Sequence, residues 1–190
     1  SQIQAAIEAA RGSGVRLKVH LHVDTGMKRF GCSPSEALAL GRLIHSSSHL
    51  IFQGIFTHFA AADDSAQDDF TLFQAKELAS IVEALEREGI RPLYRHACNS
   101  AATIRFDFDQ PLSFGFNMVR VGLATYGFHT SAASLPLLEL RPALSLTTRI
   151  CGLNDAKAGE TVSYGRTHVV ASGGARLAVL PIGYYDGLHR

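Results

Sequence analysis

The 190-residue sequence has little net charge, few cysteines and no long hydrophobic run, and each absence excludes a class of protein. The formal net charge is +1, so neither nucleic acid nor a membrane surface is expected as a partner. No apolar run approaches the length of a membrane span, and we find no secretory signal. Cys32, Cys98 and Cys151 are widely spaced and odd in number, which argues against a disulfide framework. We therefore expect a cytoplasmic protein.

Helix and strand patterns alternate through the first two thirds of the chain. Helical patterns cover residues 1–11, a segment that begins after Ser33 with Pro34 and Glu36, and a long segment capped near Asp63, Asp64 or Ser65. The patterns typical of strands cover residues 15–23, 49–59, 91–99 and 117–127. Such alternation predicts an α/β fold with parallel strands joined by right-handed crossovers.

The pattern changes near Pro142. Beyond it, three β-rich segments are separated by glycine-containing turns, with no helical pattern between them; they cover residues 142–153, 161–170 and 175–185. We expect three parts: an α/β domain over residues 1–130, a linker over 131–141, and the beginning of an all-β domain, incomplete, over 142–190.

Polar side chains gather at one end of the four expected strands. His20, His22 and Asp24 share one face of the first strand, and the ends of the others carry His58, His96, Asn99 and Arg120. Unpaired polar groups are costly inside a protein, so this face must line an interior that rewards them. In a closed β/α barrel that interior opens into a pocket at the carboxyl ends of the strands. The pattern therefore predicts a functional site there.

Three kinds of chemistry use residues of these types. Histidines with Asp24 suit zinc, but Arg29 and Arg120 would repel a cation, so no metal is expected. Ser100, together with backbone N–H groups near Gly122, suits a phosphate group. Tyrosines also occur in the β-rich part, and one could act as a base if cationic neighbours lowered its pKa; the candidates are Tyr164, Tyr184 and Tyr185.

Six motifs, in this order, resemble those of bacterial alanine racemases. They are HVDTGMKRFG, GIFTHFA, HACNSAA, NMVRVGLATYG, ETVSYGRT and LPIGYYDG, and they run from about residue 15 to the end. The resemblance implies the second half of a (β/α)8 TIM-type barrel, strands five to eight, followed by the start of a β-domain. It also implies pyridoxal 5′-phosphate (PLP) as cofactor, alanine as substrate, and a homodimer with active sites at the subunit interface.

The resemblance also implies roles for individual residues. Tyr164 matches a catalytic base that the partner subunit contributes, and Arg29 matches the arginine near the substrate carboxylate. Arg120 matches the arginine that hydrogen-bonds the cofactor's pyridine nitrogen; its permanent charge would disfavour protonation there and so favour racemisation over transamination. The remaining matches are residues that bind or support the cofactor: His58, His96, Asn99, Ser100, Gly122, Leu123 and Tyr184.

The sequence departs from the family pattern at two places. A lysine that many members carry, often as a carbamate, is His22 here, so we expect chloride, water or another carboxylate beside Arg29. The stretch FDFDQPLSFGF, residues 106–116, is longer than usual and is expected to form a surface loop. None of the lysines matches the family's cofactor-binding lysine; they are Lys18, Lys28, Lys76 and Lys157. We therefore expect a fragment that is inactive and aggregation-prone by itself, because half a barrel leaves strand edges open.

Other functions remain open. A non-catalytic PLP-binding barrel protein would share the barrel, although the β-rich segment after Pro142 argues against it. A metal-dependent barrel hydrolase would need a metal set that the arginines oppose. A broad-specificity amino-acid racemase or a decarboxylase of this barrel type would share the cofactor, and the histidine at position 22 keeps broader specificity open.

Overall fold

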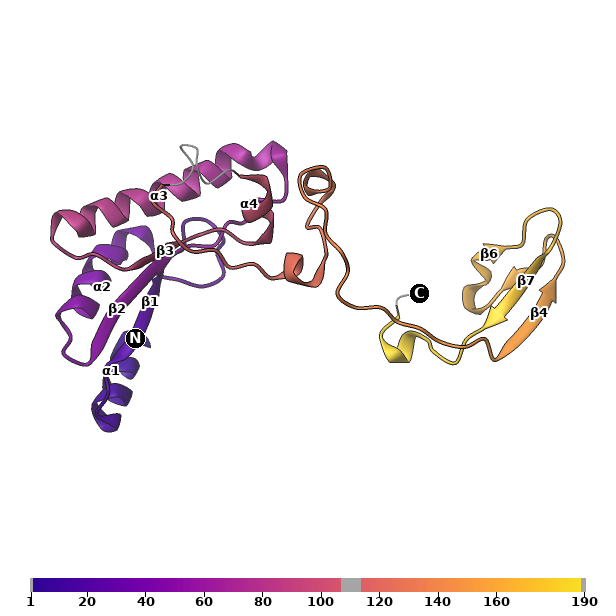
Figure 1. Cartoon of the computed structure of the whole chain (residues 1–190), viewed down its shortest axis with the longest axis horizontal. Coiled ribbons are helices and arrows are strands. Elements are labelled where there is room, and N and C mark those ends of the chain that lie inside the picture. The colour runs from indigo at the N-terminus through magenta and orange to yellow at the C-terminus, as the bar shows by residue number, and fades with distance from the viewer. Residues whose placement is uncertain (1, 107–113, 189–190) are drawn as a thin grey trace. The chain divides into compact units, whose positions relative to one another are not determined.

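The computed structural model describes residues 2–106 and 114–188 (Figure 1). The chain divides into two compact units, Ser1–Ala143 and Leu144–Arg190, and each is described by itself. The first unit holds a parallel sheet with its helices, and the second unit holds only short antiparallel strands and single turns of helix.

The sheet of the first unit has three parallel strands, as the alternation predicted. They lie in the order β1 (Leu17–His22), β2 (Leu50–Phe56) and β3 (Tyr94–His96). The register shifts between Val19 and His20, where Gln53 is the extra residue of β2. A bulge of this kind leaves one residue unpaired and changes which side chains lie opposite one another. As a result His20 pairs with Gly54 and His22 pairs with Phe56.

Four helices accompany the sheet: α1 (Gln2–Ser13), α2 (Pro34–Ser46), α3 (Asp68–Arg87) and α4 (Ser100–Arg105). The predicted start of α2 is confirmed, because the Glu36 carboxylate accepts the Ser33 N–H at 2.9 Å, as in a capping box. Asp64 caps a single turn, η1 (Ser65–Gln67), directly before α3. Helix α2 packs on β1, β2 and α3, and α1 contacts β2.

The core of the first unit lies between the sheet and these helices. It includes Leu21 and Val23 near the end of β1, Ile55 of β2, and from the helices Ile44, Leu78, Ile81, Val82 and Leu85. Three apolar residues of the helices are exposed: Leu43, Phe70 and Phe73. The Phe70 and Phe73 rings stack on each other at 6.1 Å, and Phe70 also lies against Gly26, so this end of α3 covers a turn rather than the sheet.

The predicted fourth strand is wrong as a continuous element. Residues 117–127 follow β3 through separate contacts: Asn117 N–H donates to Arg95 O at 3.0 Å, and Arg120 N–H donates to Cys98 O at 2.9 Å. The Asn117 side chain takes ladder positions itself, because it accepts from Arg95 N–H and donates to Leu93 O. Only a bridge between His96 and Met118 is present, and a turn of helix, η3 (Leu123–Tyr126), ends the segment. Of the expected surface loop, residues 107–113 lie outside the described part of the chain.

The second unit contains two antiparallel pairs. Strand β4 (Gly152–Ala156) pairs with β7 (Ala175–Val179), and β5 (Thr161–Val162) pairs with β6 (His168–Val169). The turns η5 (Tyr164–Arg166) and η6 (Tyr184–Asp186) complete it, and η4 (Ala132–Ser134) precedes it in the first unit. The residues before Gly152 that were expected to begin the first β segment are not in a strand. No helix in the described residues has the length and apolarity to cross a bilayer.

Candidate functional site

Two rows of side chains cross the sheet on one face. The register places His20, Gly54 and Tyr94 in one row and His22, Phe56 and His96 in the next, because paired residues of neighbouring strands point to the same side. In the second row the Phe56 ring is sandwiched between His22, at 4.3 Å between ring centroids, and His96, at 4.7 Å.

Gly54 provides the space for the first row. A Cβ atom at this position would lie 2.5 Å from His20 Nδ1, so any larger residue would displace the imidazole. With glycine there, the His20 ring lies 5.9 Å from the Tyr94 ring and 5.0 Å from the His96 ring.

The Arg120 guanidinium is bound by residues that follow or belong to β2 and β3. Nη1 lies 2.5 Å from His96 Nδ1, and Nη2 donates to Thr57 O at 2.8 Å and Ala97 O at 3.3 Å and lies 3.0 Å from His58 Nδ1. The guanidinium carbon also lies 5.0 Å from the Phe56 ring centroid. Burial lowers the Arg120 pKa, yet no carboxylate of a described residue forms an ion pair with it. Among the described residues, Arg120 is therefore a charged group held by neutral acceptors alone.

The proton positions on His58 and His96 follow from this arrangement. A guanidinium can only donate, so the Nδ1 atoms of both histidines must accept and their protons must lie on Nε2. Both imidazoles are accordingly neutral. Burial, reinforced by the Arg120 charge, lowers the pKa of His96 to about 4 and lowers that of His58 as well.

A small cradle lies where β3 leads into α4. Ser100 Oγ accepts the backbone N–H groups of Gly122 at 2.9 Å and of Ala124 at 3.3 Å. Asn99 caps α4 through its side chain, which accepts Ala102 N–H at 3.0 Å. Leu123 begins η3 beside Gly122, with its side chain exposed. The structure thus brings Ser100, Gly122 and Leu123 together, and Asn99 adjoins them.

Arg29 lies in the loop after β1, near the histidine cluster. Its charge contributes to the lowered pKa values of His22 and His58, which places it within electrostatic reach of both. The loop is shaped by Asp24, whose carboxylate accepts the N–H groups of Gly26 and Lys28. Asp24 was expected among the site residues, but its Oδ1 atom holds the turn by accepting both of these N–H groups.

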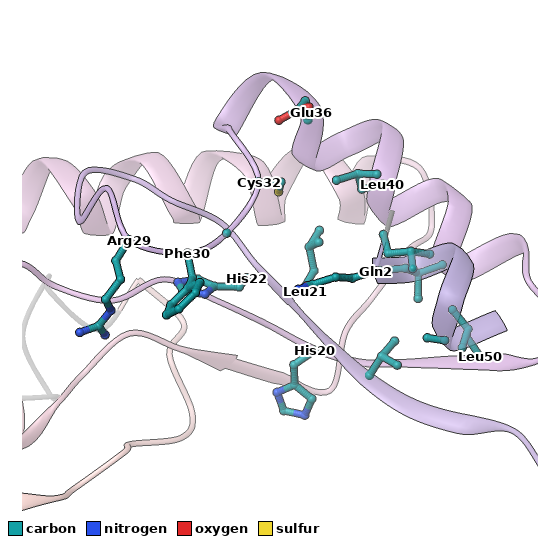
Figure 2. Close-up of a pocket in the computed structure, with 15 residues that line it drawn as sticks. Gln2, His20, Leu21, His22, Arg29, Phe30, Cys32, Glu36, Leu40 and Leu50 are labelled. Atoms are coloured by element: carbon teal, nitrogen blue, oxygen red, sulfur yellow. The ribbon is translucent and has the colours of Figure 1, made fainter. Parts of the chain in front are cut away.

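A pocket of about 850 Å³ runs along the free edge of β1, between α1 and α2. Figure 2 shows His20 and His22 projecting from one side of β1, with Arg29 near the end where His22 lies. His22 Nε2 is buried there and has no hydrogen-bond partner among the described residues. The His22 ring stacks on the Phe56 ring instead.

The two tyrosines of the predicted site lie in the second unit. Tyr164 is 79% exposed and Tyr184 is 68% exposed, each in a turn of helix. The turn around Tyr164 is strained, because Ser163 and Arg166 both have positive φ values, of 61° and 53°. Both tyrosines belong to the second unit, whereas Arg120 belongs to the first.

Two features of the site were not expected from the sequence. Phe56 joins His22, His96 and Arg120, and Thr57 supplies a carbonyl to Arg120. In the sequence, Phe56 is marked only by its place at the end of a strand, two residues after Gly54. The bulge at Gln53 decides which residues of β1 lie opposite these two, and the sequence alone does not show it. Within residues 2–106 and 114–188, no group of three or more His, Cys, Asp or Glu side chains is arranged to hold a metal ion.

Comparisons with known proteins agree with the motifs. A family model described as "Alanine racemase, N-terminal domain" matches residues 1–130, and one described as "Alanine racemase, C-terminal domain" matches residues 143–190. Alanine racemase 1 of Oceanobacillus iheyensis is 35% identical over 188 residues, which cover 99% of this chain and 48% of that protein.

Solved structures give the same result. The alanine racemase from Streptomyces coelicolor superposes with a TM-score of 0.81 at 28% identity, covering 98% of this chain and 48% of its own. A histidine racemase from Leuconostoc mesenteroides superposes with a TM-score of 0.71 at 32% identity, covering 97% and 48%. These likenesses confirm the predicted fold class, part of a TIM-type barrel followed by the start of a β-domain. The chain spans about half the length of the curated relatives it matches. It belongs to the alanine racemase family.

Proposed function

We propose that the complete protein containing this chain is a PLP-dependent racemase that interconverts L- and D-alanine by a two-base mechanism. The observation that carries the proposal is the Arg120 guanidinium, which is bound by neutral acceptors and has no carboxylate partner among the described residues. A buried cation of this kind is a site prepared for an acceptor from outside the chain.

The residues present fit PLP. Arg120 uses Nη2 and one Nη1 hydrogen for protein contacts, while its Nε–H donates to no described residue and is available to a pyridine nitrogen. Ser100 Oγ accepts two backbone N–H groups, so its own hydrogen is available to a phosphate oxygen. We assign the ring nitrogen to Arg120 and the phosphate to Ser100, Gly122 and Leu123, with Asn99 beside them.

When bound, PLP supplies an electron sink that makes the Cα proton of an amino acid easier to remove. The chain's own residues orient the substrate and move the proton. We propose that Arg29 binds the substrate carboxylate and that Tyr164 of the partner subunit removes or returns the Cα proton on one face. His58 and His96 hold Arg120 as neutral acceptors, and Tyr184 completes the pocket.

The enzyme is a cytoplasmic homodimer, its sites lie at the subunit interface, and its product serves peptidoglycan synthesis. The base on the other face is a lysine in the part of the relatives that this chain does not span, because Lys18, Lys28, Lys76 and Lys157 do not match the family motif.

A broader amino-acid racemase is the second candidate. His22 stands where many members carry lysine, and a related structure is a histidine racemase. The substrate of this fold is therefore not fixed by the family alone.

The test is a racemase assay on the complete protein with added PLP. Each L-amino acid of a panel is incubated with the enzyme, and the D-enantiomer is measured by chiral chromatography. The proposal expects alanine to be converted fastest. Equal or faster conversion of a larger amino acid would favour the broad-specificity racemase, and conversion of none would contradict both.

A further inference from the structure

His20 contacts His96, which in turn contacts Arg120, so the three side chains form a continuous chain of hydrogen bonds. Its Nδ1 lies 2.8 Å from His96 Nε2, and His96 Nδ1 lies 2.5 Å from Arg120 Nη1. The three side chains come from β1, β3 and the segment after β3, so the contact chain spans the sheet from its edge strand.

The direction of each hydrogen bond in this chain is determined by Arg120. Because the guanidinium only donates, His96 Nδ1 accepts and His96 Nε2 carries the proton. That proton can only be donated to His20 Nδ1, so His20 carries its own proton on Nε2. The side chain of Gln53, the bulge residue, also forms a hydrogen bond with the His20 ring.

The structure around His20 is built for this contact. Gly54 lies opposite His20, and a Cβ atom there would be within 2.6 Å of both Nδ1 and Cε1 of the imidazole. The bulge at Gln53 is what brings Gly54 opposite His20 rather than a residue with a side chain. Sequence and register therefore combine to keep the imidazole against His96.

Loss of the His20 acceptor would change the state of His96. His96 is 3% exposed, so an Nε2–H without an acceptor would be a buried unsatisfied donor. Moving the proton to Nδ1 would relieve this, but two N–H groups would then face each other at the Arg120 contact. Either outcome weakens the hold on Arg120.

We propose that His20 is a positioning residue, which fixes the Nε2–H tautomer of His96 and thereby holds the Arg120 guanidinium in place for its partner. The role in catalysis rests on the proposed racemase function, whereas the tautomer rests on the protein geometry alone. The groups that face His96 electrostatically are Arg120, His20 and His22.

The first test is neutron diffraction from deuterated crystals of the complete, cofactor-free protein. We expect deuterium on His96 Nε2 and none on Nδ1, with deuterium on His20 Nε2. Deuterium on His96 Nδ1 would overturn the proposal. This test needs no activity, so it decides the tautomer even if the racemase proposal fails.

The second test uses a matched pair of variants, His20→Asn and His20→Leu. Asparagine places an acceptor oxygen near the position of Nδ1, and leucine has similar branching with no acceptor. We expect kcat for alanine racemisation to fall about tenfold in His20→Leu with KM unchanged, and to stay within about threefold of wild type in His20→Asn. His45→Leu, on the exposed face of α2, is the control and should behave as wild type.

Three kinetic results would overturn the proposal. Equal losses in both His20 variants, with native thermal stability, would show that the acceptor is not what matters. Unchanged kcat in His20→Leu would show that His96 needs no fixed tautomer, and a change confined to KM would assign His20 to substrate binding instead.

Discussion

Arg120 is the residue on which the site depends, because every described group that binds it is a neutral acceptor. Two imidazoles and two backbone carbonyls share its Nη1 and Nη2 hydrogens, and the Phe56 ring lies beside its guanidinium carbon. The charge is thus positioned without being neutralised. The planar guanidinium, with N–H donors on separate nitrogen atoms, reaches acceptors that come from different elements.

Arg120→Lys should keep the positive charge and lose the planar set of N–H donors that the guanidinium provides. A single ammonium cannot reach His96 Nδ1 and the acceptors Thr57 O and His58 Nδ1 with the same geometry, so we expect kcat to fall about 100-fold and the free energy of unfolding to fall by about 1–3 kcal/mol. Steady-state kinetics and urea unfolding measure the two effects. Arg91→Lys, at an exposed position, is the matched control; wild-type kinetics in Arg120→Lys would contradict this assignment.

His96 should make stability depend on pH. Its pKa is about 4 in the folded protein and near 6.5 when unfolded, so the unfolded chain binds more protons between these values. Stability from this group is complete above pH 6.5 and is lost as pH falls toward 4, by about 2–3 kcal/mol. His20, His22 and His58 act in the same direction.

Urea unfolding of the complete protein at a series of pH values from 4 to 7 measures this loss. The His96→Gln variant should show a shallower pH dependence than wild type. An equally steep dependence in His96→Gln would contradict the assignment to His96.

At the scale of elements, the rows of side chains across the sheet form because of one bulge. Because Gln53 is unpaired, Gly54 lies opposite His20 of β1 and Tyr94 of β3. Phe56 in the same way lies opposite His22 and His96. The small residue gives one row its space, and the aromatic residue stacks the other row. The site is therefore a property of the register between strands.

Gly54→Ala tests this register. The added Cβ would lie 2.5 Å from His20 Nδ1, so the imidazole must move, and we expect the free energy of unfolding to fall by about 1–3 kcal/mol. Gly12→Ala is the control, since nothing lies within 4 Å of its Cβ in α1, and it should stabilise the protein by about 0.5–1 kcal/mol. Chemical denaturation measures both; no loss in Gly54→Ala would show that the rows tolerate a larger residue.

Local signals in the sequence were the ones that predicted structure well. The start of α2 depends on Ser33 and Glu36, which are three residues apart, and the cap is present. The strand expected over residues 117–127 depends instead on pairing with β3, where the Asn117 side chain occupies backbone positions. Contacts between distant segments are not encoded in a local pattern, so these were missed.

The candidate site was predictable to the extent that motifs name its residues. His58, His96 and Arg120 were expected together and lie within hydrogen-bond reach. His58 follows β2, His96 ends β3, and the Arg120 N–H donates to Cys98 O just beyond β3. The Phe56 sandwich was not expected, since a bulge cannot be read from alternation alone. The roles of these residues with PLP and alanine remain predictions.

At the scale of the whole molecule, the proposed site needs both units and two subunits. Arg120, His58 and His96 belong to the first unit, whereas Tyr164 belongs to the second. We propose that the tyrosine of one subunit serves the arginine of the other. A site of this kind is complete only in the dimer, since a two-fold interface places the same pair of surfaces together twice.

Tyr164→Phe should remove one of the two bases and leave the other. We expect kcat to fall about 100-fold or more in both directions, because racemisation needs a proton donor and a proton acceptor on opposite faces. Exchange of the Cα hydrogen with deuterated water should persist for one enantiomer only, as measured by NMR. Tyr185→Phe, at a 95% exposed neighbour of Tyr184, is the control. Equal exchange for both enantiomers would remove Tyr164 from the mechanism.

The most direct test of the account is activity in mixed dimers of two inactive variants, Arg120→Ala and Tyr164→Phe. If each site takes Arg120 from one subunit and Tyr164 from the other, a mixed dimer contains one intact site and one doubly altered site. Random mixing of equal amounts should then restore about a quarter of wild-type racemase activity. If the mixture is no more active than the separate variants, although mass spectrometry shows that mixed dimers have formed, the proposed shared site is wrong.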